Sequence, residues 1–157
     1  FINFVRVVSA QEMFDACHQY YESCNVAVCA AAVADYKPKQ IAEQKIKKSE
    51  AEFSIELEKT KDILASLGKI KKNQFLIGFA LETENEIENA KLKIQKKNLD
   101  LIVLNSLRDE GAGFGKATNK VTFISNDFIV EPQALKSKEE VANDIVNKII
   151  SYYEKNI

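Results

Sequence analysis

The stretch "VAVCAAAVADYKPK", residues 26–39, decides the fold that the sequence predicts. Its first nine residues are all apolar and do not alternate with polar ones, which is typical of a central strand covered on both faces. Two more runs, "QFLIGFA" at residues 74–80 and "LDLIVLN" at residues 99–105, predict further buried strands. Helical patterns separate the three runs, so we expect an α/β fold with a largely parallel sheet flanked by helices.

Three capping-box patterns mark expected helix starts, because a Ser or Thr stands three residues before a Glu. The pairs are Ser9 with Glu12, Thr83 with Glu86, and Ser137 with Glu140. They predict helices over residues 10–24, from residue 83 through 96, and from residue 137 to about 155. A shorter helix is expected up to residue 67, with Thr60 as its N-cap and Gly68 as its end.

Other segments have the patterns of more exposed strands and of turns. Residues 1–8 are rich in β-formers and predict an opening strand, while residues 51–59 alternate as a half-exposed strand does. Residues 120–132 predict a terminal β-hairpin with its turn around Asn126 and Asp127. The glycine-rich residues 111–119 are expected to form a loop near the strand ends.

Length and composition suit one soluble domain over residues 1–157. Twenty-two basic and twenty-three acidic residues give a formal net charge of -1, so no overall basic field favours nucleic acid. No apolar run reaches the roughly 18–20 residues of a membrane helix. Cys17, Cys24 and Cys29 have no metal-ligand spacing and indicate reduced thiols in a cytoplasmic protein. The β-rich pattern is present from the first residue, Phe1, so we expect the N-terminal part of the domain to be incomplete.

The candidate site lies where the apolar runs end, because ligands of open parallel sheets bind beyond the carboxyl ends of the strands. Asp35 follows the first run, and a lysine-rich flap comes after it. The flap lysines are Lys37, Lys39, Lys45, Lys47 and Lys48. A polyphosphate is the natural partner of this charge, with Asp35 as a ligand for hydroxyl groups, an amino group or Mg²⁺. A solvated surface loop would also explain the lysines, and Asp35 alone could cap that loop.

Other candidates stand at the neighbouring strand ends. Phe79 ends the second run after Gly78, where it could stack on a base or only pack in the core. Asn105 ends the third run. Lys93 and Lys97 share one helix face, where they could meet the ligand or only the helix dipole. The residues thus predict an α/β domain with a site for an anionic ligand, for which a nucleotide is the expected class.

A set of motifs extends this interpretation. They occur in the order "AAVADYKPK", "KIKK", "TKDIL", "IGFALET", "KNLDLIVLN" and "GFGKATNKV". Together they closely resemble the phosphopantothenate–cysteine ligase family, commonly the C-terminal half of a bifunctional flavoprotein of bacterial coenzyme A synthesis. The resemblance implies a Rossmann-like fold and a homodimer. It also implies a ligation in which CTP, with Mg²⁺, activates 4'-phosphopantothenate as an acyl-cytidylate, and cysteine then displaces CMP. FMN is implied only where a decarboxylase half precedes the domain.

The resemblance also assigns site residues. Lys45 matches the flap lysine and is expected to be the main catalytic residue, and Asn105 is a weaker candidate for substrate binding. The expected nucleotide contacts are Ala30, Ala31, Ala32, Asp35, Lys45, Lys61, Asp62, Ile63, Leu64, Phe79, Lys93 and Lys97.

One part of the family pattern has no counterpart in this sequence. The family begins with a strand–helix unit that carries a "GGT" turn, an asparagine and an "SSGxMG" segment. Its absence leaves open a second interpretation, a nucleotide-binding module without turnover.

Overall fold

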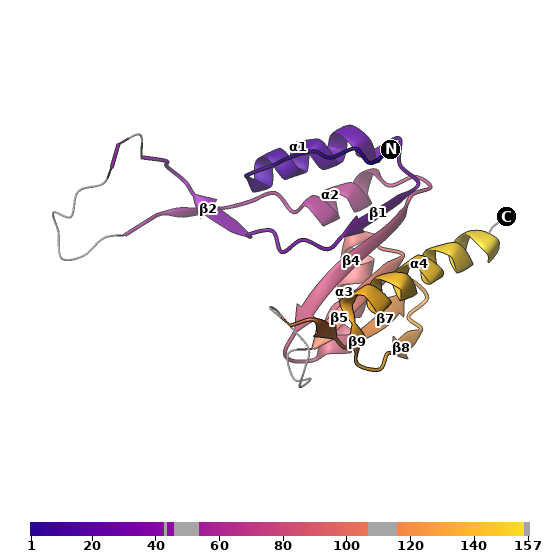
Figure 1. Ribbon diagram of the computed structural model, residues 1–157. Coiled ribbons are helices and arrows are strands. Elements are labelled where there is room, and N and C mark those ends of the chain that lie inside the picture. Colours follow the sequence, from indigo (N-terminus) through magenta and orange to yellow (C-terminus); the bar gives the residue numbers. More distant parts are fainter. Residues whose placement is uncertain (43, 46–53, 107–115, 156–157) are drawn as a thin grey trace.

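The computed structural model describes residues 1–42, 44–45, 54–106 and 116–155 (Figure 1). Their main sheet has five strands in the order β1-β4-β5-β7-β8. These are β1 (Val26–Cys29), β4 (Phe75–Glu82), β5 (Leu101–Ser106), β7 (Val121–Ser125) and β8 (Val130–Pro132). The first three are parallel, and β7 and β8 form the predicted antiparallel hairpin at the edge. The predicted α/β class with a mostly parallel sheet is confirmed.

Helices cover both faces of this sheet. They are α1 (Ala10–Tyr21), α2 (Ile63–Ile70), α3 (Glu86–Lys97) and α4 (Lys138–Lys155). Leu76 and Ile102 belong to the core beneath α1, α2 and α3, whereas Ile77 and Val103 belong to the core beneath α4. Successive strand residues point to opposite faces, so strands covered on both sides need the unbroken apolar runs seen in the sequence. None of the helices among the described residues is long and apolar enough to cross a bilayer.

Two short antiparallel ribbons complete the fold. Strand β2 (Tyr36–Pro38) pairs with β3 (Leu57–Lys59), and β6 (Thr118–Asn119) pairs with β9 (Lys136–Ser137). The first ribbon projects away from the body of the molecule (Figure 1). We call the described residues from 36 to 45 and from 54 to 59 the arm.

The N-terminal third departs from the prediction in two places. Residues 1–8 form no strand, and Phe1, Ile2 and Phe4 are exposed. The β-formers of this segment favour a strand only where a sheet is available to pack against. Because residues 1–8 pair with none of the described strands, their composition alone does not make them one. Strand β1 ends at Cys29 and pairs only with β4 in the described part of the chain, so it is an edge strand and not the central strand predicted. Val28 is accordingly 46% exposed.

The predicted helix starts are confirmed at two of four positions. Ser9 Oγ accepts a 3.1 Å hydrogen bond from the Glu12 backbone, and Ser137 and Glu140 make the same exchange before α4. The other two predictions are wrong. Thr83 caps nothing, because α3 begins after Asn85, which has a φ of 45° and no side-chain capping bond.

The error at Thr60 has a local reason. Its hydroxyl donates instead to the Ala34 carbonyl, at 2.6 Å, across the base of the arm. Asp62 is the N-cap of α2 and accepts a hydrogen bond from the Ala65 backbone at 2.9 Å. The first amides of α2 are therefore satisfied by Asp62, two residues later in the chain, and not by Thr60.

Gly68 lies inside α2 and does not end it. A Cβ at this position would stand 1.8 Å from the Lys97 carbonyl oxygen of α3. The Asn98 side chain also donates to the Gly68 carbonyl at 3.0 Å. Glycine is therefore present because two helices approach closely, and not because the chain turns.

We predict that Gly68→Ala lowers the free energy of unfolding by about 1–3 kcal/mol, because the new methyl group overlaps a backbone atom. In a free helix the same change would stabilise by about 1 kcal/mol. Urea denaturation followed by circular dichroism measures the difference. Lys69→Ala, at the adjacent exposed position, is the control and should change stability little. A stabilised Gly68→Ala variant would contradict the close approach of α2 and α3.

Candidate functional site

A cavity of about 160 Å³ lies where β1 and β4 end and α2 begins. We call it the Asp35 cavity. It brings together eight of the predicted nucleotide contacts. These are Ala31, Asp35, Lys61, Asp62, Ile63, Leu64, Phe79 and Lys97. Segments far apart in the sequence thus meet at the carboxyl rim of the parallel strands, where ligands of such sheets bind.

Two hydrogen bonds from Thr60 join the segments that line one side of this cavity. The Thr60 hydroxyl donates to the Ala34 carbonyl at 2.6 Å, and the Thr60 amide donates to the Asp35 carbonyl at 2.9 Å. They fix the backbone of Asp35 while its side chain stays exposed. Among the described residues, the Asp35 carboxylate has no hydrogen bond or ion pair. It is therefore available to a hydroxyl group, an amino group or a cation.

The inner wall carries a paired acid and two lysines. Lys97 Nζ lies 2.8 Å from Asp62 Oδ2, and Lys61 Nζ lies 4.5 Å from the ring centre of Phe14. Burial alone would raise the pKa of Asp62, but hydrogen bonds from Lys97 and the Ala65 amide outweigh it, and the pKa is lowered. The carboxylate at this helix start is thus held in its charged form.

The cysteine of the cavity is not a nucleophile at neutral pH. Cys29 lines the wall, and burial raises the pKa of its thiol to about 11. A buried thiol far below its pKa remains protonated and unreactive. All three cysteines are free.

A second cavity, of about 310 Å³, opens on the other side of Phe79, beside α4. Ala30 and Asn105 line it, so two more predicted residues lie at the same rim. The Asn119 side chain donates to Asn105 Oδ1 at 2.9 Å. Because Phe79 lines both cavities, a ligand that spans the rim would contact its ring from either side.

Comparison with known proteins identifies the family. The model described as "DNA/pantothenate metabolism flavoprotein C-terminal domain" matches residues 1–153. The chain belongs to this family.

The sequences of individual family members are similar to this chain over nearly its whole length. A "Cysteine/Cysteine sulfinic acid decarboxylase" from an unknown prokaryotic organism is 50% identical over 151 residues, which are 96% of this chain and 42% of that protein. The "Coenzyme A biosynthesis bifunctional protein CoaBC" of Bacillus subtilis (strain 168) is 40% identical over 146 residues, 93% of this chain and 36% of that protein. The chain therefore spans less than half the length of these relatives.

A solved structure of the family gives the same result for the fold. The crystal structure of the C-terminal domain of CoaBC superimposes with a TM-score of 0.78 at 39% identity, and covers 96% of this chain and 66% of that one. Family membership confirms the resemblance predicted from the motifs, and the Rossmann-like α/β architecture is shared.

Three of the predicted nucleotide contacts line neither the Asp35 cavity nor the second cavity. Ala32 is exposed and lines neither rim cavity, and Lys93 is ion-paired with Glu82. Lys45 is exposed on the arm and lines neither cavity. Lys47, Lys48 and the residues 111–115 lie outside the described part of the chain. The assigned roles of all these residues stay predictions.

Some lining residues were missed by sequence reasoning. Thr60 was interpreted as a helix cap, although its position two residues before Asp62 was a usable signal. Met13, Cys29 and Asn119 also line the rim cavities, and no local pattern marks them. They reach the site through the packing of α1 and through strand pairing, which a single sequence does not reveal.

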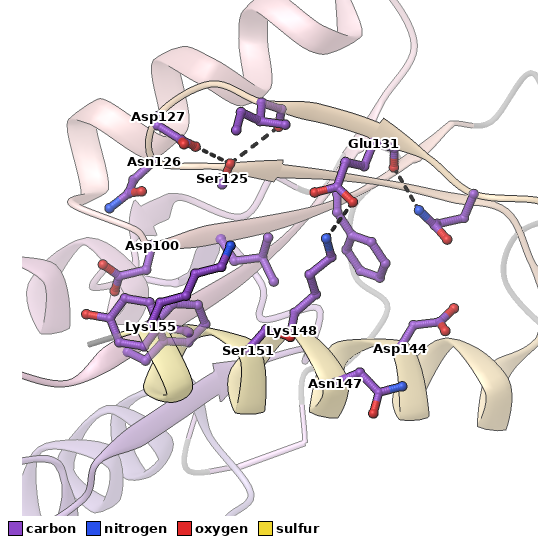
Figure 2. Close-up of a pocket in the computed structure, with 16 residues that line it drawn as sticks. Asp100, Ser125, Asn126, Asp127, Glu131, Asp144, Asn147, Lys148, Ser151 and Lys155 are labelled. Carbon is purple, nitrogen blue, oxygen red and sulfur yellow. Dashed lines mark hydrogen bonds and ion pairs between the residues drawn. The ribbon is translucent and has the colours of Figure 1, made fainter. Parts of the chain in front are cut away.

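Another cavity of the described structure lies at the opposite rim of the sheet, between α4 and the β7–β8 hairpin (Figure 2). Its volume is about 480 Å³. Its charged groups are largely neutralised by partners, since Lys148 pairs with Glu131 and Asp127 bonds to Ser125. Asp100 likewise pairs with Lys71 at 2.9 Å. This cavity is therefore a poorer candidate for an anionic ligand than the carboxyl rim, although it is larger than either cavity there.

We predict that the free energy of unfolding of the wild-type chain differs from that of the Asp62→Asn variant by an amount that depends on pH. Asparagine keeps the helix cap but not the ion pair with Lys97. Because the folded pKa of Asp62 is lowered, the pair stabilises the protein above the unfolded pKa of about 3.9, and this contribution is lost as the pH falls through the folded pKa. Urea titrations between pH 7 and pH 2.5 measure it.

Asp62→Ala is the control, because it removes the cap as well. Its additional cost of about 1 kcal/mol relative to Asp62→Asn should persist at every pH. A difference between wild type and Asp62→Asn that does not change with pH would contradict the ion pair.

Proposed function

We propose that the chain carries the ligase part of a phosphopantothenate–cysteine ligase, which joins 4'-phosphopantothenate and cysteine in coenzyme A synthesis. The observation that carries the proposal is the Asp35 cavity, which gathers eight predicted nucleotide contacts at one place. Similarity to the CoaBC proteins over more than nine-tenths of the chain supports it.

The nucleotide is proposed to be CTP, bound along the carboxyl rim. The base stacks near Phe79 and Ala31, and Asp35 accepts hydrogen bonds from hydroxyl or amino groups. Lys61 and Lys97 supply positive charge for the phosphates. The ion pair of Lys97 with Asp62 keeps that lysine in place before a ligand arrives, so little side-chain entropy is lost on binding.

The proposed reaction has two steps. A carboxylate oxygen of phosphopantothenate attacks the α-phosphorus of CTP, the bond to pyrophosphate breaks, and an acyl-cytidylate forms. The amine of cysteine then attacks the acyl carbon, CMP leaves with the bonding electrons, and the nitrogen loses a proton. We place the acyl substrate in the second cavity beside Asn105, because Phe79 lines both that cavity and the cavity proposed for the nucleotide. Catalysis then consists mainly of positioning and charge neutralisation.

Magnesium is proposed to enter with the triphosphate. The described residues contain no group of three or more His, Cys, Asp or Glu side chains able to hold a metal. Mg²⁺ commonly binds to substrate phosphates and only one or two carboxylates, and the exposed Asp35 fits that requirement.

Three further features belong to the same proposal. We expect a homodimer, as the family resemblance implies, and a cytoplasmic location, as the three cysteines without metal-ligand spacing indicate. FMN is expected only in a decarboxylase half of a longer polypeptide, for which the relative named as a decarboxylase is a precedent.

A nucleotide-binding module without turnover is the second candidate. It is favoured by one observation, the position of Lys45 on the arm and outside both rim cavities. A domain that binds CTP without the catalytic lysine near the phosphates would hold the nucleotide and leave it intact.

We predict that the chain binds CTP with Mg²⁺ and that Asp35→Asn weakens this binding by about 5- to 150-fold, the loss of one charge-assisted contact. Isothermal titration calorimetry measures the affinity. Asp127→Asn is the matched control, because it removes an exposed carboxylate at the opposite rim.

The reaction is tested by adding 4'-phosphopantothenate and cysteine and measuring pyrophosphate release together with the mass of the amide product. Release and product together support the ligase. CTP binding with neither would favour the module without turnover, and no CTP binding would contradict both.

A further inference from the structure

The second cavity lies between the sheet and one face of α4. Side chains of β4 and β5 alternate between the two sides of the sheet, and every second one faces α4. Those that form the floor of the cavity are Phe79, Leu81 and Asn105. The wall of α4 consists of residues three or four positions apart, which share one helix face. They are Lys138, Val141, Ala142 and Ile145.

The lining of this cavity is apolar except for a few groups. Sites for small molecules are commonly of this kind, with volumes of about 300–1,000 Å³ and a small number of polar groups that fix the ligand. At about 310 Å³ the second cavity belongs to this range. Among the described residues that line it, Lys138 alone carries a charge. The character of the ligand therefore depends on this lysine.

The backbone of Lys138 is held firmly while its ammonium group is left available. The Lys138 amide donates to the Ala117 carbonyl at 3.1 Å, and the preceding residue, Ser137, pairs with Thr118 in the β6–β9 ribbon. In the described part of the chain, no carboxylate or other side chain pairs with the ammonium group of Lys138. A cation beside apolar walls is favoured by an anionic ligand, because nothing else there matches its charge.

The floor of the cavity adds a second donor. Asn105 Oδ1 accepts from the Asn119 side chain at 2.9 Å, and Asn119 Oδ1 accepts from the Lys120 amide at 3.1 Å. The Asn105 Nδ2 group has no partner among the described residues. Two donors, one charged and one neutral, thus face an otherwise apolar space. An anion with an apolar body and oxygen acceptors is the ligand class that matches this arrangement.

The proposed acyl substrate has this chemistry. 4'-Phosphopantothenate has a carboxylate at one end, a phosphate at the other, and a branched apolar chain with an amide between them. Its carboxylate must reach the α-phosphorus of the nucleotide, so this end lies near Phe79, which lines both rim cavities. The phosphate at the far end then needs a separate countercharge, and among the described lining residues Lys138 can supply it.

We propose that Lys138 binds the phosphate group of the acyl substrate and makes the second cavity selective for phosphorylated over unphosphorylated pantothenate. The inference rests on the proposed function and deepens it, because it names the residue that recognises one end of the substrate. That phosphate takes part in neither step of the proposed reaction. Loss of the ammonium group therefore weakens substrate binding and leaves the chemistry at the carboxylate unchanged.

Isothermal titration calorimetry with 4'-phosphopantothenate and, separately, with pantothenate tests the proposal. Wild type should bind the phosphorylated compound about 10- to 150-fold more tightly, the effect of one charge-assisted contact. Lys138→Gln should remove most of this difference by weakening the binding of 4'-phosphopantothenate alone, whereas Lys138→Arg should preserve it. Lys96→Gln, at an exposed position of α3, is the matched control and should keep the full difference.

Two results of this titration would overturn the proposal. One is equal affinity of wild type for the two compounds, and the other is undiminished selectivity in Lys138→Gln. A wild-type chain that binds neither compound would refute it as well, because the second cavity would then not be a site for the acyl substrate.

A second variant tests the location of the site. Ala142→Phe fills the cavity from the exposed side of α4, one turn from Lys138, and lies outside the Asp35 cavity. It should weaken 4'-phosphopantothenate and pantothenate alike and leave the affinity for CTP at the wild-type value. Unchanged binding of both acyl compounds would place them outside the second cavity and so contradict the proposal.

The affinity for CTP separates this proposal from the proposed function. A chain that binds CTP and forms the amide product, but whose selectivity survives Lys138→Gln, keeps the ligase assignment and loses the phosphate site. A chain that binds no CTP, but discriminates between the two acyl compounds through Lys138, keeps the phosphate site and loses the ligase assignment.

Discussion

The parallel pairing of β4 with β5 is the constraint on which the rest of the structure depends, and Asp100 holds it in register. One carboxylate oxygen of Asp100 accepts from the Leu76 amide at 2.7 Å, and the Asp100 amide donates to the Leu76 carbonyl at 2.9 Å. The carbonyl of Asp100 accepts in turn from Asn126. The charge is matched by Lys71, also nearly buried. Loss of one member of such a pair leaves an uncompensated buried charge, which is far more costly than loss of a surface pair.

This pairing at the amino-terminal ends of the strands determines what meets at their carboxyl ends. With the register fixed, Phe79 lies opposite Val103, and Asn105 lies opposite Leu81. Phe79 consequently stands between the two rim cavities, while Gly78 leaves room for Leu64 of α2, whose methyl group would be 2.6 Å from a Cβ there. The site is thus shaped by residues that also determine the packing of the sheet.

The fold class was predictable because it follows from a strong and local signal, the unbroken apolar runs at Phe75 and Leu101. The site was partly predictable for a similar reason, since the end of each run marks the rim. What failed depended on tertiary contacts. Thr60 resembles a helix cap but bonds to Ala34, and Gly68 resembles a helix end but allows α3 to approach.

Lys45 shows that closeness in sequence and closeness in space are separate questions. Its proximity to Asp35 in the sequence suggested proximity in space, whereas an antiparallel ribbon carries its residues steadily away from its base. Met13 and Cys29 illustrate the converse, because they are distant from Asp62 in sequence and share its cavity. Sequence patterns identify elements and their ends, and the pairing of elements decides which ends meet.

The two hydrogen bonds of Thr60 at the base of the arm have a mechanical consequence. They join Thr60, which follows β3, to Ala34 and Asp35, which precede β2, so the two strands of the ribbon are held together at its base beside the cavity. Because the ribbon is joined there, its orientation is set by the backbone of Ala34 and Asp35, which also line the cavity.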